Sequence, residues 1–177
     1  MLLDLVEKRR SIRKFTDEKV SEEDLREILT IALHAPTAKN RNPVRYIIIR
    51  DKKRLEELSN YKVNSAKFLA GADVAIAIVT DSEIAPNTNH QDASIAATYI
   101  LLAAADLDLG ATWANVTDSK HESGIPAQEF LHKFFDLEDK FDVECIIGIG
   151  NPAEEKSEKV PFEYSENVFE DLHDKLK

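Results

Sequence analysis

Apolar and polar residues alternate along the chain in blocks that predict helices and strands in turn. In residues 22–35 the apolar positions recur every three or four residues, the spacing of one helix face, and Ser21 with Asp24 forms a cap-like start. Shorter apolar stretches rich in β-branched residues predict buried strands. These predicted strands are 44–50, 73–80, 111–116 and 143–149.

Helical spacing also recurs before and between these strands. The segment 89–108 is apolar on almost every side, so we expect it in the centre of the fold or in a subunit interface, with Gly110 as its stop. Pro36 ends the helix that begins near residue 22. The predicted helices are 2–9, 22–35, 53–60, 63–70, 89–108 and 127–135. Because strands and helices alternate without a repeat or a linker, we expect a single domain over residues 1–177, with helices around one sheet.

The composition limits the partners and the location that we expect. The 177 residues include 33 acidic and 23 basic ones, and the net charge of -10 argues against nucleic acid or an anionic membrane as the main partner. It leaves room for a local basic pocket that binds one phosphate. The start of the chain lacks the basic and then apolar stretch of a signal peptide, and the apolar run 93–105 is too short to span a bilayer. We therefore expect a cytoplasmic protein with no membrane segment.

Side chains that carry nucleophilic or metal chemistry are sparse. Cys145 is the single cysteine, and its place inside an apolar run indicates a buried, inert thiol. The histidines have no ligand-like spacing with Cys, Asp or Glu, so we expect no metal site. They stand at positions 34, 90, 121, 132 and 173. No Gly-x-Ser-x-Gly elbow and no Gly-Lys-Ser/Thr phosphate loop is present in the sequence.

The basic run from Arg9 to Arg13 is the most informative candidate site. It holds three arginines and Ser11 within five residues. Guanidinium groups bind a phosphate monoester through bidentate, charge-assisted hydrogen bonds, and a serine hydroxyl adds a neutral donor. The run can therefore hold one phosphorylated ligand. On composition alone, a solvated charge run on an amino-terminal arm explains it more readily.

Two further stretches could contact a flat ring or its polar chain. The segment 36–43 has a proline at each end and short polar side chains between, which suit ribityl hydroxyls or a ring edge. The segment 110–116 follows the most apolar helix, so its backbone amides could meet a heteroaromatic ring. Taken alone, each stretch has a simpler interpretation. The segment 36–43 would only connect a helix to a strand, and Trp113 in the segment 110–116 would only pack in the core.

Taken in order, these motifs resemble the nitroreductase family. They are Arg-Arg-Ser-x-Arg-x-Phe from Arg9 to Phe15, Ala-Pro-Thr-Ala-x-Asn-x-Asn-Pro from Ala35 to Pro43, Gln-Asp-Ala-Ser from Gln91 to Ser94, Leu-Gly-Ala-Thr-Trp from Leu109 to Trp113, Ile-Gly-Ile-Gly-Asn-Pro from Ile147 to Pro152, and Lys-Val-Pro from Lys159 to Pro161. Each motif is weak alone. Their shared order over nearly the whole chain is specific.

The resemblance implies an α+β fold of three layers, in which helices flank a central mixed, mostly antiparallel sheet. It also implies a homodimer that binds FMN at its interface, with each flavin touched by both subunits. By position, Arg9, Arg10 and Ser11 look like contacts to the phosphate and the ribityl chain. Arg13 looks like the base near flavin N1 and O2, where its charge would stabilise the anionic reduced flavin.

Further contacts to FMN are implied by position. They are Pro36, Thr37, Ala38 and Asn40 in the loop given by the other subunit, and Asn64, Trp113, Asn115, Val116 and Lys159. Asn64 matches a residue that bonds the pyrimidine edge of the ring, and Asn115 with Val116 matches the backbone that faces flavin N5. Val116 stands where glycine is frequent, and Lys159 stands where the family often has an arginine on the phosphate.

The activity that the resemblance implies is a two-step, ping-pong cycle. NADH or NADPH passes a hydride to flavin N5 and leaves, and an oxidised small-molecule acceptor such as a nitro compound or a quinone takes its place. The cofactor carries the chemistry, so no side-chain nucleophile or general base is required, and any proton could come from solvent. Two alternatives remain: other flavin chemistry of the family, such as dehalogenation or oxidation of an organic substrate, and a non-catalytic FMN-binding carrier or sensor.

Overall fold

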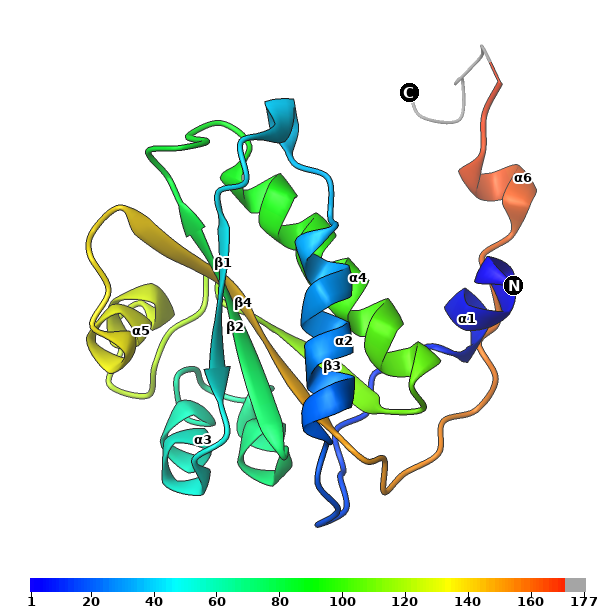
Figure 1. Cartoon of the computed structure of the whole chain (residues 1–177), viewed down its shortest axis with the longest axis horizontal. Coiled ribbons are helices and arrows are strands. Elements are labelled where there is room, and N and C mark those ends of the chain that lie inside the picture. The colour runs from blue at the N-terminus through cyan, green and yellow to red at the C-terminus, as the bar shows by residue number, and fades with distance from the viewer. Residues whose placement is uncertain (171–177) are drawn as a thin grey trace.

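A four-stranded sheet forms the middle layer of the structure, a computed structural model that describes residues 1–170 (Figure 1). Its strands are β1 (Val44–Ile49), β2 (Val74–Asp81), β3 (Gly110–Asn115) and β4 (Phe141–Gly150). They lie in the order β1-β2-β4-β3, and each neighbouring pair is antiparallel. A parallel bridge between Ser11 and Ala111 adds one short contact outside the four strands. The predicted mostly antiparallel sheet is confirmed, and every pair of neighbouring strands is antiparallel.

Helices cover both faces of the sheet. They are α1 (Leu2–Lys8), α2 (Glu22–Leu33), α3 (Lys52–Leu58), α4 (Asn89–Asp106), α5 (Ala127–Phe135) and α6 (Tyr164–Asn167), with the 3-10 turns η1 (Ala38–Asn40) and η2 (Lys67–Gly71). Apolar side chains of α2 and α4 form one core with the sheet, and those of α3, η2 and α5 form another on the opposite face. The result is the three-layer α+β arrangement that the sequence predicted (Figure 1).

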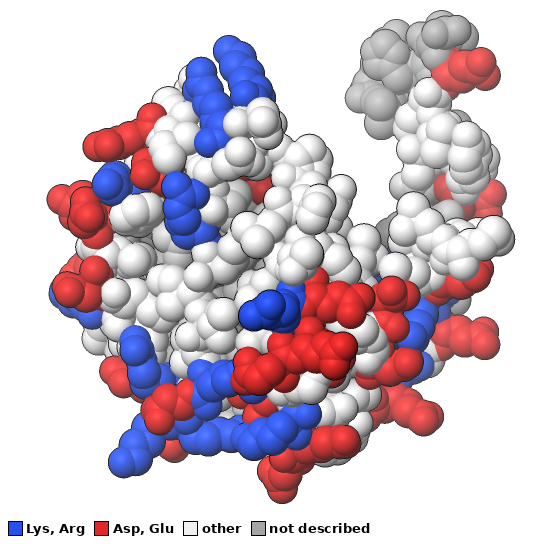
Figure 2. Space-filling view, viewed as in Figure 1, with Lys and Arg blue, Asp and Glu red and all other residues white. Residues whose placement is uncertain are grey.

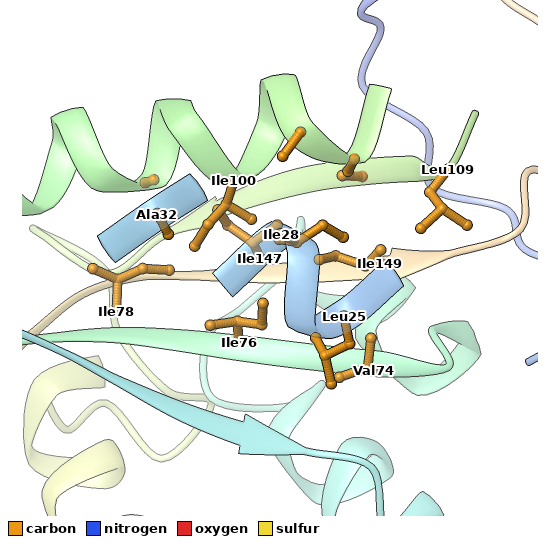
Figure 3. Packing of buried hydrophobic residues seen from close by; sticks show 14 of the residues in the cluster. Leu25, Ile28, Ala32, Val74, Ile76, Ile78, Ile100, Leu109, Ile147 and Ile149 are labelled. Carbon is orange, nitrogen blue, oxygen red and sulfur yellow. The ribbon is translucent and has the colours of Figure 1, made fainter. Parts of the chain in front are cut away.

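Alternation along β2 explains why its sequence is apolar without interruption. Ile76 and Ile78 point into the core beneath α2 and α4, whereas Ala75, Ala77 and Val79 point into the other core. In the first core, side chains from both helices and from two strands interdigitate (Figure 3). None of the described helices is both long and apolar enough to cross a membrane.

The structure corrects two predicted elements. Residues 63–70 are not a helix: Asn64 and Ser65 have φ of 62° and 53°, and this left-handed backbone breaks the helix and leaves only the short 3-10 turn η2. The strand predicted to be buried at 44–50 is β1, an edge strand of mixed exposure, in which Ile48 is 44% exposed and Ile49 only 4%. A strand at the edge of the sheet has a neighbour on one side only.

The end of α4 differs from the prediction that Gly110 stops it. The left-handed residue is Asp108, with φ of 60°, and the amide of Leu109 donates to the carbonyl of Ala104 at 2.8 Å, as in a Schellman motif. Gly110 already belongs to β3 and has another role. A Cβ at this position would lie 2.7 Å from Cγ2 of Ile12, so the missing side chain makes room for the amino-terminal arm.

Candidate functional site

The amino-terminal arm, residues 9–15, lies against the free edge of β3. Because β3 is the last strand of the sheet, its outer edge has no strand partner. The amide of Ile12 donates to the carbonyl of Ala111 at 3.1 Å, and Oγ1 of Thr112 donates to the carbonyl of Ile12 at 2.6 Å. The buried side chain of Ile12 over Gly110 completes the attachment. The arm therefore presents its arginines at the start of this edge.

Arg9 and Arg10 line a cleft of about 310 Å³, together with Lys8 and Lys156. Nη1 of Arg10 is buried and has no hydrogen-bond partner among the described residues. A buried N–H without a partner is costly, more so on a charged group, so this nitrogen fits a ligand oxygen such as that of a phosphate. The side chain of Arg13 is exposed.

Glu154 holds the arm from the segment that follows β4. Its Oε1 accepts hydrogen bonds from the amides of Arg13 at 2.6 Å and Lys14 at 3.3 Å, and its Oε2 accepts one from Nζ of Lys156 at 2.6 Å. The hydrogen bond from Lys156, followed by that from the Arg13 amide, lowers the pKa of Glu154 to about 2. The carboxylate thus fixes the backbone on which the arginines stand.

At the other end of β3, two side chains donate to the carbonyl of Asn115. It accepts hydrogen bonds from the hydroxyl of Tyr61 at 2.9 Å and from Nζ of Lys62 at 2.8 Å. Burial lowers the pKa of Lys62, which is 8% exposed. The amide of Val63 donates to the carbonyl of Lys120 at 2.9 Å, which fastens this loop beside the strand end. Asn64 follows in the same loop with an exposed side chain, so the structure brings it to the same end of β3 as Asn115.

Backbone alternation decides which amides of β3 face outward. In an antiparallel strand, both polar groups of one residue point to the same side, and the side changes at each residue. The backbone polar groups of Ala111 face the arm. The amides of Trp113 and Asn115 therefore also point to the free edge of β3. The amide of Val116 instead donates to the carbonyl of Glu144 at 3.3 Å, and its side chain is buried. Of the two residues predicted to face flavin N5, only Asn115 has its amide at this edge.

The free edge is long enough for an extended ligand. From Ala111 to Asn115 it measures about 13 Å at the usual rise of a strand. Guanidinium groups stand near its first end, and outward amides with Asn64 stand at its far end. The half-buried Trp113 packs against the core of α2 and α4 between them. The edge suits a ligand with a phosphate at one end and a hydrogen-bonding ring at the other.

The loop with Pro36, Thr37, Ala38 and Asn40 does not lie beside the arm in one chain. The amide of Ala38 donates to Oδ1 of the buried Asp92 at 2.9 Å, which anchors the loop at the start of α4. The arm lies near the other end of α4, where Lys8 pairs with Asp108, about 20 Å further along the helix. The loop also leads into β1, at the opposite edge of the sheet from β3.

Lys159 does not line the cleft beside Arg9 and Arg10. It is exposed on the extended tail that follows β4, and Figure 1 shows this tail leaving the body of the molecule. The lysine beside the arginines is Lys156. The role predicted for Lys159 stays a prediction.

Sequence reasoning missed several residues that shape this edge, namely Tyr61, Lys62 and Glu154. Their roles depend on contacts with residues far away in the sequence, such as Glu154 with Arg13. Only Lys62 had a signal, since it stands two residues before Asn64. In the part of the chain that the structure describes, no group of three or more His, Cys, Asp or Glu residues could hold a metal ion; His173 lies outside that part.

Charges are mixed on the face of the molecule that Figure 2 shows. Positive side chains gather around α3 and over the loop with η1, with acidic groups and uncharged surface between them. Such a surface offers no continuous basic track for a nucleic-acid backbone on this face.

The nitroreductase family model matches residues 6–67 and 53–151 of this chain. These two overlapping stretches span most of the described fold and include the arm, the loop and all four strands. The chain belongs to the nitroreductase family.

One curated relative and two solved structures match this nitroreductase family member over most of their length. A protein of Archaeoglobus fulgidus with the provisional name NADH dehydrogenase/NAD(P)H nitroreductase is 30% identical over 157 residues, 87% of each chain. Among solved structures, an FMN-dependent nitroreductase of Clostridium difficile R20291 has a TM-score of 0.91 at 36% identity, covering 96% of this chain and 99% of that one. A protein of Desulfovibrio desulfuricans with the provisional name nitroreductase, solved in complex with FMN, has a TM-score of 0.80 at 30% identity, covering 97% of both chains. The predicted nitroreductase-like fold is confirmed.

Proposed function

We propose that the chain is an FMN-dependent oxidoreductase that takes electrons from NADH or NADPH. The observation that carries this proposal is the free edge of β3, with the buried, unpartnered Nη1 of Arg10 near one end and the outward amide of Asn115 at the other. The residues present fit FMN, because one end offers cations for a phosphate and the other offers hydrogen-bond donors for a polar ring. Family membership and the FMN bound to one relative support the same cofactor.

Each part of the edge has a role in holding the cofactor. Arg9 and Arg10 bind the phosphate, and Ser11 adds a hydroxyl for the phosphate or the ribityl chain. Asn64 bonds the pyrimidine edge of the ring, and the Asn115 amide donates to the ring from the free edge of β3. Lys62 donates to the Asn115 carbonyl at the same edge and so fixes this end of the strand.

FMN, when bound, supplies the redox chemistry by taking a hydride from the nicotinamide and passing two electrons to an oxidised acceptor such as a nitro compound or a quinone. The chain supplies position and electric field. Arg13 carries a positive charge that favours the anionic reduced state of the ring. The backbone edge of β3 closes one side of the site and limits the approach of water. Donor and acceptor use the same open face in turn, which is a ping-pong cycle.

The site is completed by a second copy of the chain. One chain keeps the loop 37–40 at the far end of α4 from its own arm, so the loop is available to an arm from a partner. Large exposed apolar side chains gather on α1 and on the tail, the two segments that stand off from the body in Figure 1. They are Met1, Leu2, Leu3, Val6, Val160, Phe162, Tyr164 and Val168. Ile95 adds an exposed apolar side chain on α4. Such surface favours a homodimer with FMN at its interface.

A visible spectrum tests the proposed function. The purified chain is supplied with FMN, freed of unbound flavin and recorded before and after anaerobic addition of NADH or NADPH. We expect a bound-flavin spectrum that either nicotinamide bleaches and that an oxidised acceptor restores. Bound flavin that no nicotinamide bleaches would indicate a carrier or sensor, or a different donor. A chain that retains no flavin would refute the proposal.

Acceptor chemistry separates the remaining alternatives within the family. Product analysis with a nitroaromatic, a quinone and a halogenated phenol distinguishes reduction from dehalogenation. We expect turnover of the nitroaromatic or the quinone, and release of halide alone would instead assign the chain to the dehalogenating branch.

A further inference from the structure

A histidine at the start of α4 is held by a buried carboxylate. Oε2 of Glu144, whose side chain is 9% exposed, accepts a hydrogen bond from Nδ1 of His90 at 2.7 Å. Oε1 of the same carboxylate accepts a second hydrogen bond, from Oγ of Ser94 at 3.1 Å. A carboxylate that accepts from Nδ1 fixes the ring and leaves Nε2 as the nitrogen that meets a ligand or solvent. The His90 side chain is 59% exposed, so Nε2 is accessible.

His90 lines a pocket of about 390 Å³ that begins where β3 ends. Val116 and Thr117 form another part of its wall. Val116 directly follows Asn115, and its amide donates to the carbonyl of Glu144 at 3.3 Å. Glu144 therefore both orients His90 and holds the end of β3. The pocket therefore opens beside the ring end of the proposed flavin site.

Gln128, which also lines this pocket, has an unused hydrogen-bond acceptor. Gln128 donates from Nε2 to Oδ1 of Asp142 at 3.1 Å, while its Oε1 is buried and has no partner among residues 1–170. A buried acceptor without a donor is unfavourable, so the pocket suits a ligand that brings one, such as the hydroxyl of a reduced acceptor. Asp118 and Lys120 are the charged groups that share the pocket wall with His90.

We propose that this pocket receives the electron acceptor and that His90 is a catalytic residue that donates a proton to it. The inference rests on the proposed function. A quinone carbonyl accepts two electrons and one hydrogen as a hydride from the reduced flavin, which returns to the oxidised state. Nε2 of protonated His90 gives the second hydrogen as a proton to a quinone oxygen. The products are a hydroquinone, oxidised flavin and neutral imidazole, which regains its proton from solvent.

Two acceptors with different proton requirements test the proposal. Reduced holoenzyme is mixed anaerobically with menadione, a naphthoquinone that needs protons, or with ferricyanide, which takes electrons alone. In His90→Gln we expect the menadione rate to fall by about tenfold or more, the lower range of general acid catalysis. The ferricyanide rate and the rate of bleaching by NADH or NADPH stay within about twofold of the parent chain.

A matched variant and the remaining outcomes complete this experiment. His132→Gln removes a histidine of α5 that does not line the pocket, and it should leave all three rates unchanged. Equal losses with menadione and ferricyanide would assign His90 a structural role, and an unchanged menadione rate would make solvent the proton source. Either result overturns the inference. A parent chain without bound flavin, or without bleaching, instead overturns the proposed function.

Nitrogen-15 NMR of labelled histidines supplies a readout that does not depend on turnover. Oxidised holoenzyme cannot reduce menadione, so the quinone serves as a plain ligand. We expect menadione to shift the Nε2 resonance of His90, assigned by its loss in His90→Gln, and to leave His132 unaffected. A His90 resonance that menadione does not move would contradict the placement of the acceptor.

Discussion

Arg10 and Arg13 lie close together on the arm, but their guanidinium groups have different surroundings. Arg10 has a buried Nη1 without a protein partner, whereas the Arg13 side chain is exposed to solvent. Water satisfies an exposed guanidinium, but the buried nitrogen gains a partner only when a ligand arrives. We therefore expect Arg10 to contribute more than Arg13 to phosphate binding.

We predict that Arg10→Met weakens FMN binding. Loss of a charge-assisted hydrogen bond costs roughly 1.5–3 kcal/mol, so the Kd for FMN should rise by about 10- to 100-fold. Quenching of flavin fluorescence during titration measures it. Arg26→Met, on the exposed side of α2, is the control and should leave the Kd unchanged. Equal affinities of the parent chain and Arg10→Met would place the phosphate elsewhere.

Gly110 shows how one absent side chain positions the arm. We predict that Gly110→Ala lowers the free energy of unfolding by about 1–3 kcal/mol, because the new Cβ would lie 2.7 Å from Cγ2 of Ile12. The substitution should also weaken FMN binding, because a displaced Ile12 would shift the neighbouring arginines of the arm. Gly71→Ala is the control: no atom lies within 4 Å of its Cβ position. Urea unfolding compares the two, and equal effects would show that the contact with Ile12 is unimportant.

At the scale of elements, the site depends on contacts between two segments from opposite ends of the chain. The arm precedes α2, the tail follows β4, and Glu154 joins them through the Arg13 and Lys14 amides. Phe15 and Pro152 form a further bridge between the same two segments. The amide of Ala153 donates to the carbonyl of Lys14 and the amide of Thr16 to that of Asn151, both at 2.9 Å, so backbone hydrogen bonds and the carboxylate together set the separation of the two segments.

The Glu154 contact predicts a pH-dependent contribution to stability. Its pKa falls from 4.5 to about 2 in the fold, so the ionised form is favoured in the native state. The contribution is present above the ordinary pKa and is lost as pH falls from 4.5 toward about 2. We expect Glu154→Gln to lower the free energy of unfolding at neutral pH, with the difference shrinking at about pH 3. Glu155→Gln, its exposed neighbour, should show no such pH dependence.

At the scale of the whole molecule, the separation between arm and loop is the reason that the proposed site needs a second subunit. α4 keeps the two groups of predicted contacts at its opposite ends, since Ala38 is anchored to Asp92 and Lys8 to Asp108. A shared site of this kind also explains why the chain exposes apolar side chains on α1 and the tail. Burial of these side chains in an interface would stabilise the dimer.

Subunit mixing tests the shared site. Homodimers of Arg10→Met and of Ala38→Trp should each bind FMN poorly at both sites. In a mixed dimer, one site combines both altered segments and the other combines two unaltered ones, so we expect parent-like affinity at one site per mixed dimer. Differently tagged chains purified together, followed by flavin titration, measure the stoichiometry. Mixed dimers without recovered binding would mean that each chain forms its own site.

Local patterns predicted most elements but not their surroundings. The capped start of α2 is confirmed, because Ser21 accepts the Asp24 amide at 2.9 Å. The segment 63–70 was wrong as a helix, since its apolar spacing does not report the left-handed backbone at Asn64 and Ser65. The prediction of strand β1 was correct in its extent and wrong in its burial. Burial depends on the order of the strands in the sheet, and that order depends on distant segments.

The amino-acid sequence by itself determined the alternation of helices and strands, the inward faces of α2 and β2, and the ordered motifs that place the chain among the nitroreductases. These features depend on neighbouring residues and on side-chain period, which a sequence displays directly. Only the tertiary structure decided that β3 is an edge with outward amides, that Glu154 holds the arm, and that Glu144 orients His90. Each of these joins residues far apart along the chain, and such contacts exist only once the layers have packed.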